Sequence, residues 1–415
     1  MRSTPKSMRL HIGLFGRRNA GKSSLLNAIT DQQVSIVSDV AGTTTDPVEK
    51  AMELLPLGPV LFIDTAGLDD EGKLGELRKE RTRAVFERVD LGVIVCGEGE
   101  WGTHEENLYA LLEEKKVPVI VVFNKSEILR PAAALVEALS ERKMTVLSLS
   151  ALTGEGLEDF RKALLDSAPA DFVEQPVILS DLVGPGELAV LVTPIDKEAP
   201  KGRLIMPQVQ SIRDLLDGDA SCLVTTDKGL ADTLAKLKDP PKLVVTDSQA
   251  FLKVAADTPE NIPMTGFSIL FARYRGDLVT QVEGALAIDG LKPGDRILIA
   301  ESCSHHPIED DIGRVKIPRW LMNYVGGELI FDTVQGHDFK MDLNPYSLVI
   351  HCGACVTNRR AMLNRLLHCH RAGVPVTNYG LTIAYSLGIF ERALEPFPAA
   401  LEAFQKHKAA TVARK

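Results

Sequence analysis

Short apolar runs separated by amphipathic stretches fill the first 166 residues of the chain. Each run has the length of a buried strand, and the stretches between the runs have the length of a helix. This alternation predicts an α/β fold with a doubly wound, mostly parallel sheet and helices on both faces. The predicted strands are residues 10–15, 60–63, 91–95, 119–123 and 145–149.

Two more blocks of alternating strands and helices follow a proline-containing stretch at residues 166–176. In the second block we predict strands at 189–192, 222–225 and 243–246, and helices near 209–216, 229–238 and 248–256. In the third block we predict helices at 267–287 and 358–370, and strands at 296–300, 347–350 and 374–377. The breaks between blocks predict three α/β domains, at residues 1–170, 171–262 and 263–415.

The composition is that of an ordinary globular protein, with 45% hydrophobic and 25% charged residues among 415. The net charge of −9 argues against general binding to nucleic acid or to an anionic membrane, because both need a positive surface. No apolar run is long enough to span a bilayer, and the first residues lack the apolar core of a signal peptide. We therefore expect a cytoplasmic protein without a membrane or nucleic-acid partner.

Residues 16–23 (GRRNAGKS) match the phosphate-binding P-loop, between a predicted strand and a predicted helix. The glycines let backbone N–H groups surround phosphate oxygens, and the helix N-terminus adds partial positive charge. Lys22 is expected to reach the β- and γ-phosphates, and Ser23 to ligate Mg²⁺. The expected nucleotide contacts in this segment are Gly16, Asn19, Ala20, Gly21, Lys22, Ser23 and Ser24.

Four further motifs follow in the order expected of a GTPase. Thr44, in the sequence GTTTD, is the predicted switch threonine and second protein ligand of Mg²⁺. Asp64 supports Mg²⁺, and Gly67 senses the γ-phosphate. The predicted base-recognition residues are Asn124, Lys125, Glu127, Ser150 and Ala151. Over residues 9–166 the chain resembles the G domains of translation-factor-related GTPases, which implies GTP binding with Lys22, Thr44, Asp64 and Gly67 as catalytic residues.

Two departures from the usual GTPase pattern change the expected activity. Glu127 stands where an Asp usually reads guanine, so the carboxylate is one methylene farther out and selectivity for guanine is open. Leu68 stands where many GTPases place a water-orienting Gln, so unaided hydrolysis is expected to be slow. Similar GTPases with Asn at the position of Asn19 bind K⁺ beside the phosphates. That resemblance implies a potassium-stimulated GTPase, the alternative being that Asn19 only shapes the loop.

A Cys/His constellation in the third block is the second chemical feature. Cys303 and His305 follow one predicted strand, and His351, Cys352 and Cys355 follow another. Because ligands bind at the carboxyl ends of strands in open α/β sheets, both segments are expected to lie at one edge. In a reducing cytosol such a spaced set of cysteines indicates metal binding or catalysis rather than disulfides.

The spacing alone leaves three interpretations of this constellation. One is a structural zinc site with four closed ligands. Another is an iron–sulfur cluster held by three cysteines with one open iron. The last is a set of unconnected cysteines. Cys96, Cys222 and Cys369 are expected to be packing residues.

A G domain, a small α/β middle domain and a C-terminal C-x-H…H-C-x-x-C set together resemble the HydF family, the GTPase maturation factors of iron–iron hydrogenases. The resemblance spans essentially the whole chain. It implies a 4Fe-4S cluster on Cys303, Cys352 and Cys355, with His305 and His351 as additional candidate ligands. It also implies a middle domain that forms a homodimer, and a transient diiron precursor received from two radical-SAM maturases and passed to apo iron–iron hydrogenase.

GTP hydrolysis is then expected to act as a switch on partner engagement, since a switch needs two states with different partner affinity. The rival interpretation is a tRNA-modification or ribosome-associated GTPase with a structural zinc domain. That rival predicts a basic face and tetrahedral zinc, and the acidic net charge counts against it.

Overall fold

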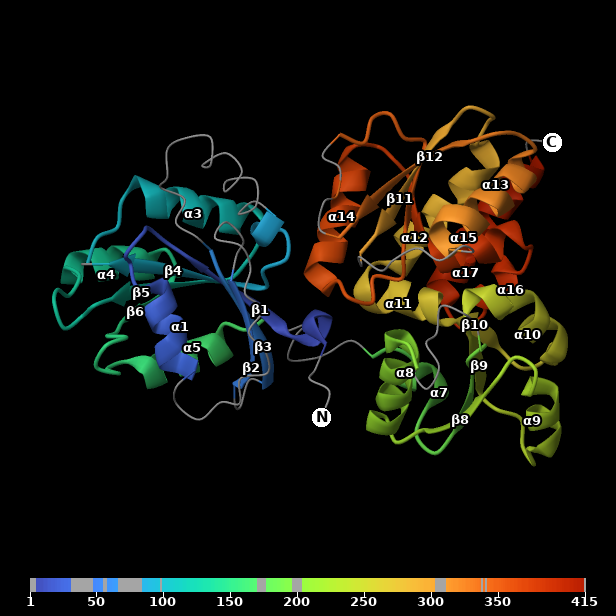
Figure 1. The fold of residues 1–415 in the computed structure, drawn as a ribbon, viewed down its shortest axis with the longest axis horizontal. Helices are drawn as coiled ribbons and strands as arrows, with labels where there is room; N and C mark the ends of the chain where they lie inside the picture. The colour runs from blue at the N-terminus through green and yellow to red at the C-terminus, as the bar shows by residue number, and fades with distance from the viewer. Residues whose placement is uncertain are drawn as a thin grey trace. The chain divides into compact units, whose positions relative to one another are not determined.

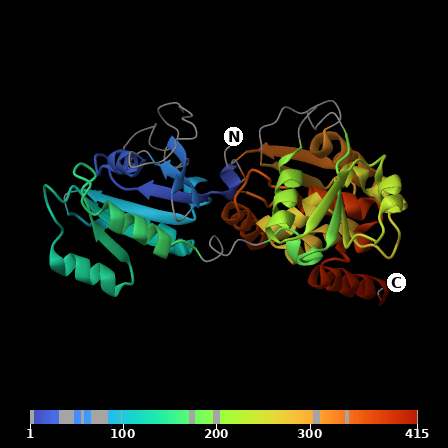
Figure 2. The same cartoon turned by 90° about the horizontal axis from the view of Figure 1, so that it is seen from below.

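The chain forms two compact units, residues 1–175 and 176–415. The computed structural model describes residues 5–30, 48–54, 58–65, 84–97, 99–169, 177–195, 204–302, 311–336, 339 and 342–413. Figures 1 and 2 draw both units, and each is described by itself below.

The first unit is built on a six-stranded sheet in the order β2-β3-β1-β4-β5-β6. All neighbouring pairs are parallel except β2 with β3. The strands are β1 (Leu10–Phe15), β2 (Val48–Leu54), β3 (Gly58–Asp64), β4 (Leu91–Gly97), β5 (Val119–Asn124) and β6 (Thr145–Ser148). The helices are α1 (Lys22–Thr30), α3 (Thr103–Glu114), α4 (Ala133–Glu141) and α5 (Leu157–Asp166). The expected α/β, doubly wound fold is confirmed.

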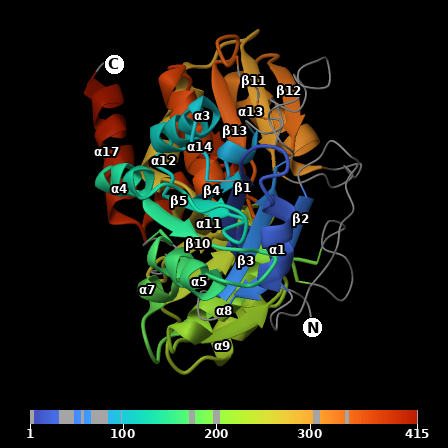
Figure 3. The ribbon, with the colours of Figure 1, turned by 90° about the vertical axis from the view of Figure 1, so that its left-hand side faces the viewer.

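A hydrophobic core covers each face of this sheet. On one face, side chains of α1 and α5 such as Leu25 and Phe160 pack against alternate residues of β1. On the other face, side chains of α3 and α4 such as Leu112 and Leu139 pack against Phe15 and its neighbours. Figure 3 shows the strands between these two helix layers. Burial on both faces explains why the central strands are uniformly apolar.

The second unit contains two four-stranded sheets of parallel strands, in the orders β10-β9-β7-β8 and β12-β11-β13-β14. The first sheet consists of β7 (Leu188–Val192), β8 (Ser221–Thr225), β9 (Leu243–Thr246) and β10 (Met264–Gly266), with α7 (Ser180–Val183), α8 (Met206–Asp217), α9 (Leu230–Lys236) and α10 (Phe251–Asp257).

The second sheet carries the cysteines. Its strands are β11 (Arg296–Glu301), β12 (Ile330–Gln335), β13 (Leu348–His351) and β14 (Val376–Asn378). Its helices are α11 (Phe267–Arg275), α12 (Leu278–Leu286), α13 (Ile317–Val325), α14 (Arg359–Arg371), α15 (Tyr379–Ser386), α16 (Phe390–Leu394) and α17 (Pro398–Ala413). Side chains of α12, α13 and α15 cover one face and those of α14 cover the other (Figure 1). Helix α17 packs on α12 and α16 at the edge of the unit (Figure 2).

One hydrophobic core runs through both sheets of the second unit, from Ile178 to Ala400. The expected boundary after residue 262 falls inside this core, because Ile262 and Met264 both belong to it. Strand β10 moreover pairs with β9 of the first sheet. The division into three domains stays a prediction; the observed sheets and the shared core are compatible with two sub-structures that fold as one unit.

The single helix expected over residues 267–287 is wrong, because the structure has two helices there. Helix α11 ends at Gly276, whose N–H donates to the Ala272 carbonyl at 3.0 Å. Asp277 then begins α12 by accepting a hydrogen bond from the backbone N–H of Thr280 at 2.7 Å. A carboxylate that accepts from a free backbone N–H is a strong signal for the start of a helix. The sequence prediction missed this start because the apolar periodicity continues on both sides of Asp277.

Candidate functional site

The P-loop connects β1 to α1 in a conformation that requires its glycines. Gly16 has a φ of 139°, and a Cβ there would lie 2.2 Å from the Val95 carbonyl oxygen. Gly21 has a φ of 91°, and a Cβ there would lie 2.2 Å from the Asn124 amide nitrogen. Asn19 also adopts a left-handed conformation, with a φ of 62°, and its side chain is exposed. Neighbouring strands and loops therefore press directly against the phosphate-binding backbone.

Lys22 and Ser23 lie where the first turn of α1 meets this loop. The Lys22 ammonium is buried and donates to the carbonyl oxygens of Gly16 and Arg17 at 2.8 and 2.9 Å. The exposed Ser23 hydroxyl donates to Asp64 Oδ2 at 2.6 Å. Ser23 and Asp64, the two residues expected to hold or support Mg²⁺, are therefore in contact where β3 ends and the P-loop leads into α1.

The Asp64 carboxyl at the end of β3 is partly buried. Burial raises its pKa above the usual value, while the Ser23 hydrogen bond and the charge of Lys22 oppose that rise. A divalent cation bound to this pair would favour the ionised carboxylate, in which both oxygens accept.

Asn124, at the end of β5, ties the base-recognition loops to the P-loop. Its side chain is 1% exposed; Nδ2 donates to the Ala20 carbonyl at 3.0 Å, and Oδ1 accepts from the Ala151 N–H at 3.0 Å. The hydroxyl of Ser150 accepts from the Thr153 N–H and shapes the next loop. Lys125 has a left-handed φ of 64° and Glu127 is exposed. The structure therefore brings the motifs at residues 16–24, 64, 124–127 and 150–151 to one edge of the sheet. Thr44, Gly67 and Leu68 lie outside the described residues.

The second candidate site lies at the carboxyl ends of β11 and β13. The Cys352 N–H donates to the Ala300 carbonyl at 2.9 Å, and its Sγ accepts from the Ser302 N–H at 3.1 Å. Ala354 has a left-handed φ of 52°, and the Thr357 N–H closes the turn on the Ala354 carbonyl at 3.1 Å. The thiolate is the form of cysteine that binds metal.

The cysteines of this turn suit a soft metal or an iron–sulfur cluster. Cys352 and Cys355 are both partly exposed. Beside them the Ser302 hydroxyl is buried and has no hydrogen-bond partner among the described residues. Cys303 and His305 lie outside the described residues. Across the described residues, no group of three or more His, Cys, Asp and Glu side chains suits a metal ion.

His351 lies at the site, and both of its ring nitrogens contact other protein atoms. It is fully buried; its Nδ1 lies 3.0 Å from the Cys352 carbonyl oxygen, and its Nε2 lies 2.6 Å from Nη1 of Arg365. Burial and the nearby charge of Arg365 lower its pKa to about 3. The ring is therefore neutral at physiological pH, and whether it ligates metal stays a prediction.

Arg365 is a residue of this site that the sequence did not reveal. It lies on α14, fourteen residues after His351, and belongs to no local motif. The Cys96 side chain is buried in a core of the first unit, and the Cys369 side chain is buried in the core that also contains Ala354 of the turn. Burial raises the pKa of the Cys369 thiol to about 12, so it stays protonated at neutral pH.

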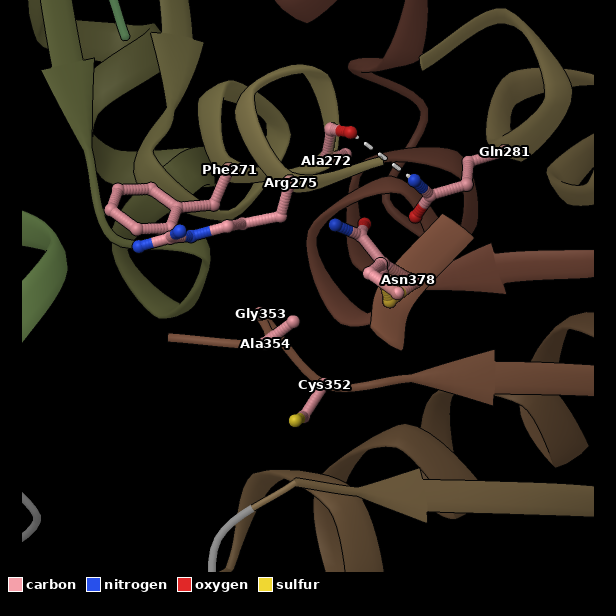
Figure 4. Close-up of a pocket in the computed structure, with 9 residues that line it drawn as sticks. Phe271, Ala272, Arg275, Gln281, Cys352, Gly353, Ala354 and Asn378 are labelled. Carbon is pink, nitrogen blue, oxygen red and sulfur yellow. Dashed lines mark hydrogen bonds between the residues drawn. The ribbon is translucent and has the colours of Figure 1, made fainter. Parts of the chain in front are cut away.

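A narrow recess borders the cysteine turn on the α11 side. It is lined by Cys352, Gly353 and Ala354 on one side, and by side chains of α11, α12 and α14 together with Asn378 on the other. Figure 4 shows the Gln281 amide hydrogen-bonded to the Ala272 carbonyl, which links α12 to α11 on the wall that faces the turn. The turn therefore faces a mixed surface, with apolar side chains such as Phe271 and Met362 beside the polar side chains of Arg275, Gln281 and Asn378.

Family models match most of the chain. Residues 178–276 match the hydrogen maturase F dimerization domain, and residues 279–396 match the hydrogen maturase F tetramerization domain. The chain belongs to the hydrogen maturase F family. Residues 11–125 match the family described as 50S ribosome-binding GTPase, so the first unit of this hydrogen maturase F member is a GTPase domain. The resemblance inferred from the motifs is thereby confirmed.

Curated relatives match over part of the chain. It is 40% identical to GTPase Der of Wolinella succinogenes over 123 residues, which are 29% of this chain and 26% of that relative. It is 35% identical to tRNA modification GTPase MnmE of Nitrosomonas europaea over 160 residues, which are 38% of this chain and 35% of that relative. The chain thus spans about a quarter to a third of the length of these relatives.

Solved structures give likenesses of similar extent. The G domain of the FeoB iron transporter of T. maritima is 24% identical, with a TM-score of 0.30, and the match covers 38% of this chain and 98% of that one. Era of Aquifex aeolicus bound to GDP and AlF4⁻ is 20% identical, with a TM-score of 0.33, and the match covers 52% of this chain and 92% of that one. Within the described residues, no helix of this family member is both long and apolar enough to cross a membrane.

Proposed function

We propose that the chain is a GTPase scaffold that carries a diiron precursor to apo iron–iron hydrogenase. In this proposal two radical-SAM maturases supply the precursor, and Cys303, Cys352 and Cys355 hold a 4Fe-4S cluster beside which it is carried. The observation that supports it best is the Cys352 turn, with its thiol accepting from Ser302, in a chain with both hydrogen maturase F domains.

At the cluster site, the role of the protein would be to hold the cluster, to orient it and to shield it from solvent. The Cys352 and Cys355 thiolates would be ligands, and the cluster would supply an iron that accepts an exchangeable bridge. The Ser302 N–H donates to Cys352 Sγ and lowers the cost of its negative charge. Three protein thiolates leave one iron without a cysteine, which suits a carrier that must release its cargo. His305 remains a candidate exchangeable ligand, whereas His351 would ligate only after giving up its contact with Arg365 or with the Cys352 carbonyl.

At the nucleotide site the residues bind GTP and position it for hydrolysis. Backbone N–H groups of the P-loop and Lys22 hold the phosphates, and Ser23, Thr44 and Asp64 hold or support Mg²⁺. Attack by water on the γ-phosphate breaks its bond to the bridging oxygen and yields GDP and phosphate, with Gly67 sensing that phosphate. K⁺ bound at Asn19 would stabilise the developing charge, and Leu68 leaves water orientation to other groups, so the rate is slow.

Hydrolysis acts in this proposal as a switch for partner release rather than as the chemistry of cluster building. Residues 178–276 would form the homodimer, and residues 279–396 would allow dimers to associate further, as the names of the matched family domains indicate. The protein would act in the cytoplasm with protein partners and without nucleic acid. The MnmE-like alternative gains no support from the second unit, which matches hydrogen maturase F domains instead.

Anaerobic reconstitution tests the cluster. The native chain and the variants Cys303→Ser, Cys352→Ser and Cys355→Ser are loaded with iron and sulfide, reduced with dithionite and measured by EPR. Cys222→Ser, in β8 of the other sheet, is the matched control. We expect a 4Fe-4S signal in the native chain and the control, and its loss or strong change in the three variants. Tightly held zinc without such a signal would contradict the proposal.

Delivery needs a separate assay. Protein isolated after co-expression with the two maturases is mixed with apo iron–iron hydrogenase, and hydrogen evolution is measured. Activation by the native chain but not by Cys352→Ser supports the carrier role. Activation by neither would leave the chain as a GTPase without a carrier role, and equal activation by both would show that delivery does not depend on the Cys352 site.

A further inference from the structure

Arg365 is a buried cation at the carboxyl edge of the cysteine-bearing sheet. Its side chain is 8% exposed and reaches from α14 to the ends of two strands. Nη2 donates to the Gly336 carbonyl, just after β12, at 2.7 Å, and Nη1 donates to His351 Nε2, at the end of β13, at 2.6 Å. The guanidinium also lies over the ring of Phe339, 5.3 Å from its centroid. These contacts fix the position of its charge.

Donation from Arg365 also fixes the histidine. Because a guanidinium N–H can only donate, His351 Nε2 must be the unprotonated acceptor. The proton is then on Nδ1, which donates to the Cys352 carbonyl oxygen at 3.0 Å. Arg365 is thus linked, through one neutral ring, to the backbone of a cysteine in the turn.

Within the described part of the chain, no carboxylate balances the charge of Arg365. Among the residues that the structure describes, none lies within ion-pair distance of its guanidinium. The nearby buried Glu301 instead pairs with Arg314 at 2.9 Å. A buried charge without a counter-charge is costly. Burial lowers the pKa of Arg365, and the two groups that oppose this shift are the neighbouring Cys352 and Cys369. Of these two, only Cys352 belongs to the turn at the carboxyl edge of the sheet.

We propose that Arg365 is the buried counter-cation of the cluster held on Cys352 and Cys355, and that its charge favours the one-electron-reduced form of that cluster. This inference rests on the proposed function. Reduction adds one negative charge, supplied in the test by dithionite, and no bond forms or breaks. A fixed positive charge in a poorly solvated place stabilises that added charge more than an exposed one would. Arg365 is therefore a positioning and charge-compensating residue, not a ligand.

The test is an EPR-monitored redox titration of the reconstituted full-length chain. Arg365→Gln removes the charge but keeps an N–H donor for His351, and Arg365→Lys keeps the charge but loses the forked geometry. Arg371→Gln, on the same helix but exposed, removes an equal charge away from the turn. We expect Arg365→Gln to lower the ratio of reduced to oxidised cluster at fixed potential about tenfold, which is about 59 mV for one electron. Arg365→Lys and Arg371→Gln should stay close to the native ratio.

Each outcome decides the inference. A native ratio in Arg365→Gln that still binds iron and sulfide overturns it, and so does an equal fall in Arg371→Gln. If Arg365→Gln binds no cluster, the redox titration of Arg365→Lys decides the question. A native reduction potential in Arg365→Lys would support charge compensation by residue 365, and a lowered potential would overturn it. Absence of a cluster from the native chain would instead contradict the proposed function itself.

Discussion

A substitution at Asn19 can test whether its side chain binds K⁺ without changing the backbone conformation of the P-loop. Its φ of 62° is strained for most residues but open to glycine. Asn19→Gly therefore keeps the backbone and removes only the side-chain oxygen that would ligate K⁺. We expect nucleotide affinity to change little and the stimulation by K⁺ over Na⁺ to be lost, as measured by phosphate release in each salt. Undiminished stimulation in Asn19→Gly would show that this side chain is not a K⁺ ligand.

Gly21 and Gly58 form a matched pair for testing close contact in the nucleotide site. Their φ angles are 91° and 93°, but a Cβ on Gly21 meets Asn124 Nδ2 at 2.2 Å whereas one on Gly58 meets nothing within 4 Å. Both Ala variants bear backbone strain of about 1 kcal/mol. We expect only Gly21→Ala to lose nucleotide affinity, by more than about tenfold, in a titration with fluorescent GDP. Similar affinities in the two variants would argue against the Asn124 contact.

His11 makes the stability of the first unit depend on pH. It is buried in β1, its Nε2 lies 2.9 Å from the Lys6 carbonyl, and burial lowers its pKa to about 4. The unfolded chain, with a pKa near 6.5, then binds the proton more tightly. Stability is therefore full above about pH 6.5 and falls as the pH drops toward 4, by about 3 kcal/mol at most.

His11→Gln tests that prediction, because glutamine retains a donor for Lys6 but does not titrate. Urea unfolding of the first unit between pH 7 and 4 should give a shallower fall in the variant than in the native chain. Parallel curves would assign the acid sensitivity to carboxylates instead.

At the level of residues, the sequence predicted those that belong to contiguous motifs. Lys22, Asp64, Asn124 and Cys352 occur at fixed spacings beside strand ends, so a local pattern was enough to find them. Arg365 was missed because its role depends on β12, β13 and α14 meeting in space. Buried Glu105, which holds Arg17 of the P-loop at 2.9 Å, was missed for the same reason.

At the level of elements, Asp277 is the residue that separates α11 from α12. Its side chain accepts from the Thr280 N–H and satisfies a donor that α12 leaves free. We expect Asp277→Ala to lower the free energy of unfolding of the second unit by about 1 kcal/mol, and Asp277→Asn, which can still accept, to lower it far less. Urea unfolding followed by circular dichroism measures both. Equal losses in the two variants would show that the cap contributes little.

Central strands were predictable, whereas edge strands were predictable only in part: β6, β8 and β14 were found, and β2, β10 and β12 were missed. The predicted run at residues 10–15 agrees with β1 because both faces of that strand are buried. Strands β2 and β12 were missed because charged residues and exposed positions interrupt their apolar pattern, so the apolar signal is weak. Strand β10 was missed because it has three residues, too few for a period to show.

At the level of the whole molecule, the distribution of cores sets the unfolding behaviour. The first unit has two cores of its own, one on each face of its sheet. The second unit has one core that joins both of its sheets and a smaller core under α14. Cooperative unfolding follows shared burial, so we expect two transitions rather than three.

Calorimetry with and without Mg²⁺ and GDP tests this expectation. Nucleotide binds only the folded first unit, so it should raise the transition temperature of that unit and leave that of the second unit unchanged.

The shared core also predicts how fragments fold. Residues 177–415 should fold alone, whereas residues 177–262 should not, because Phe251 and Val254 would lose core partners from α11, α15 and α16. A third transition, or cooperative unfolding of an isolated 177–262 fragment, would show instead that the three predicted domains fold independently. In that case the sheet with the cluster site could change conformation independently of the dimerisation region. A single core shared by both sheets instead couples their conformations.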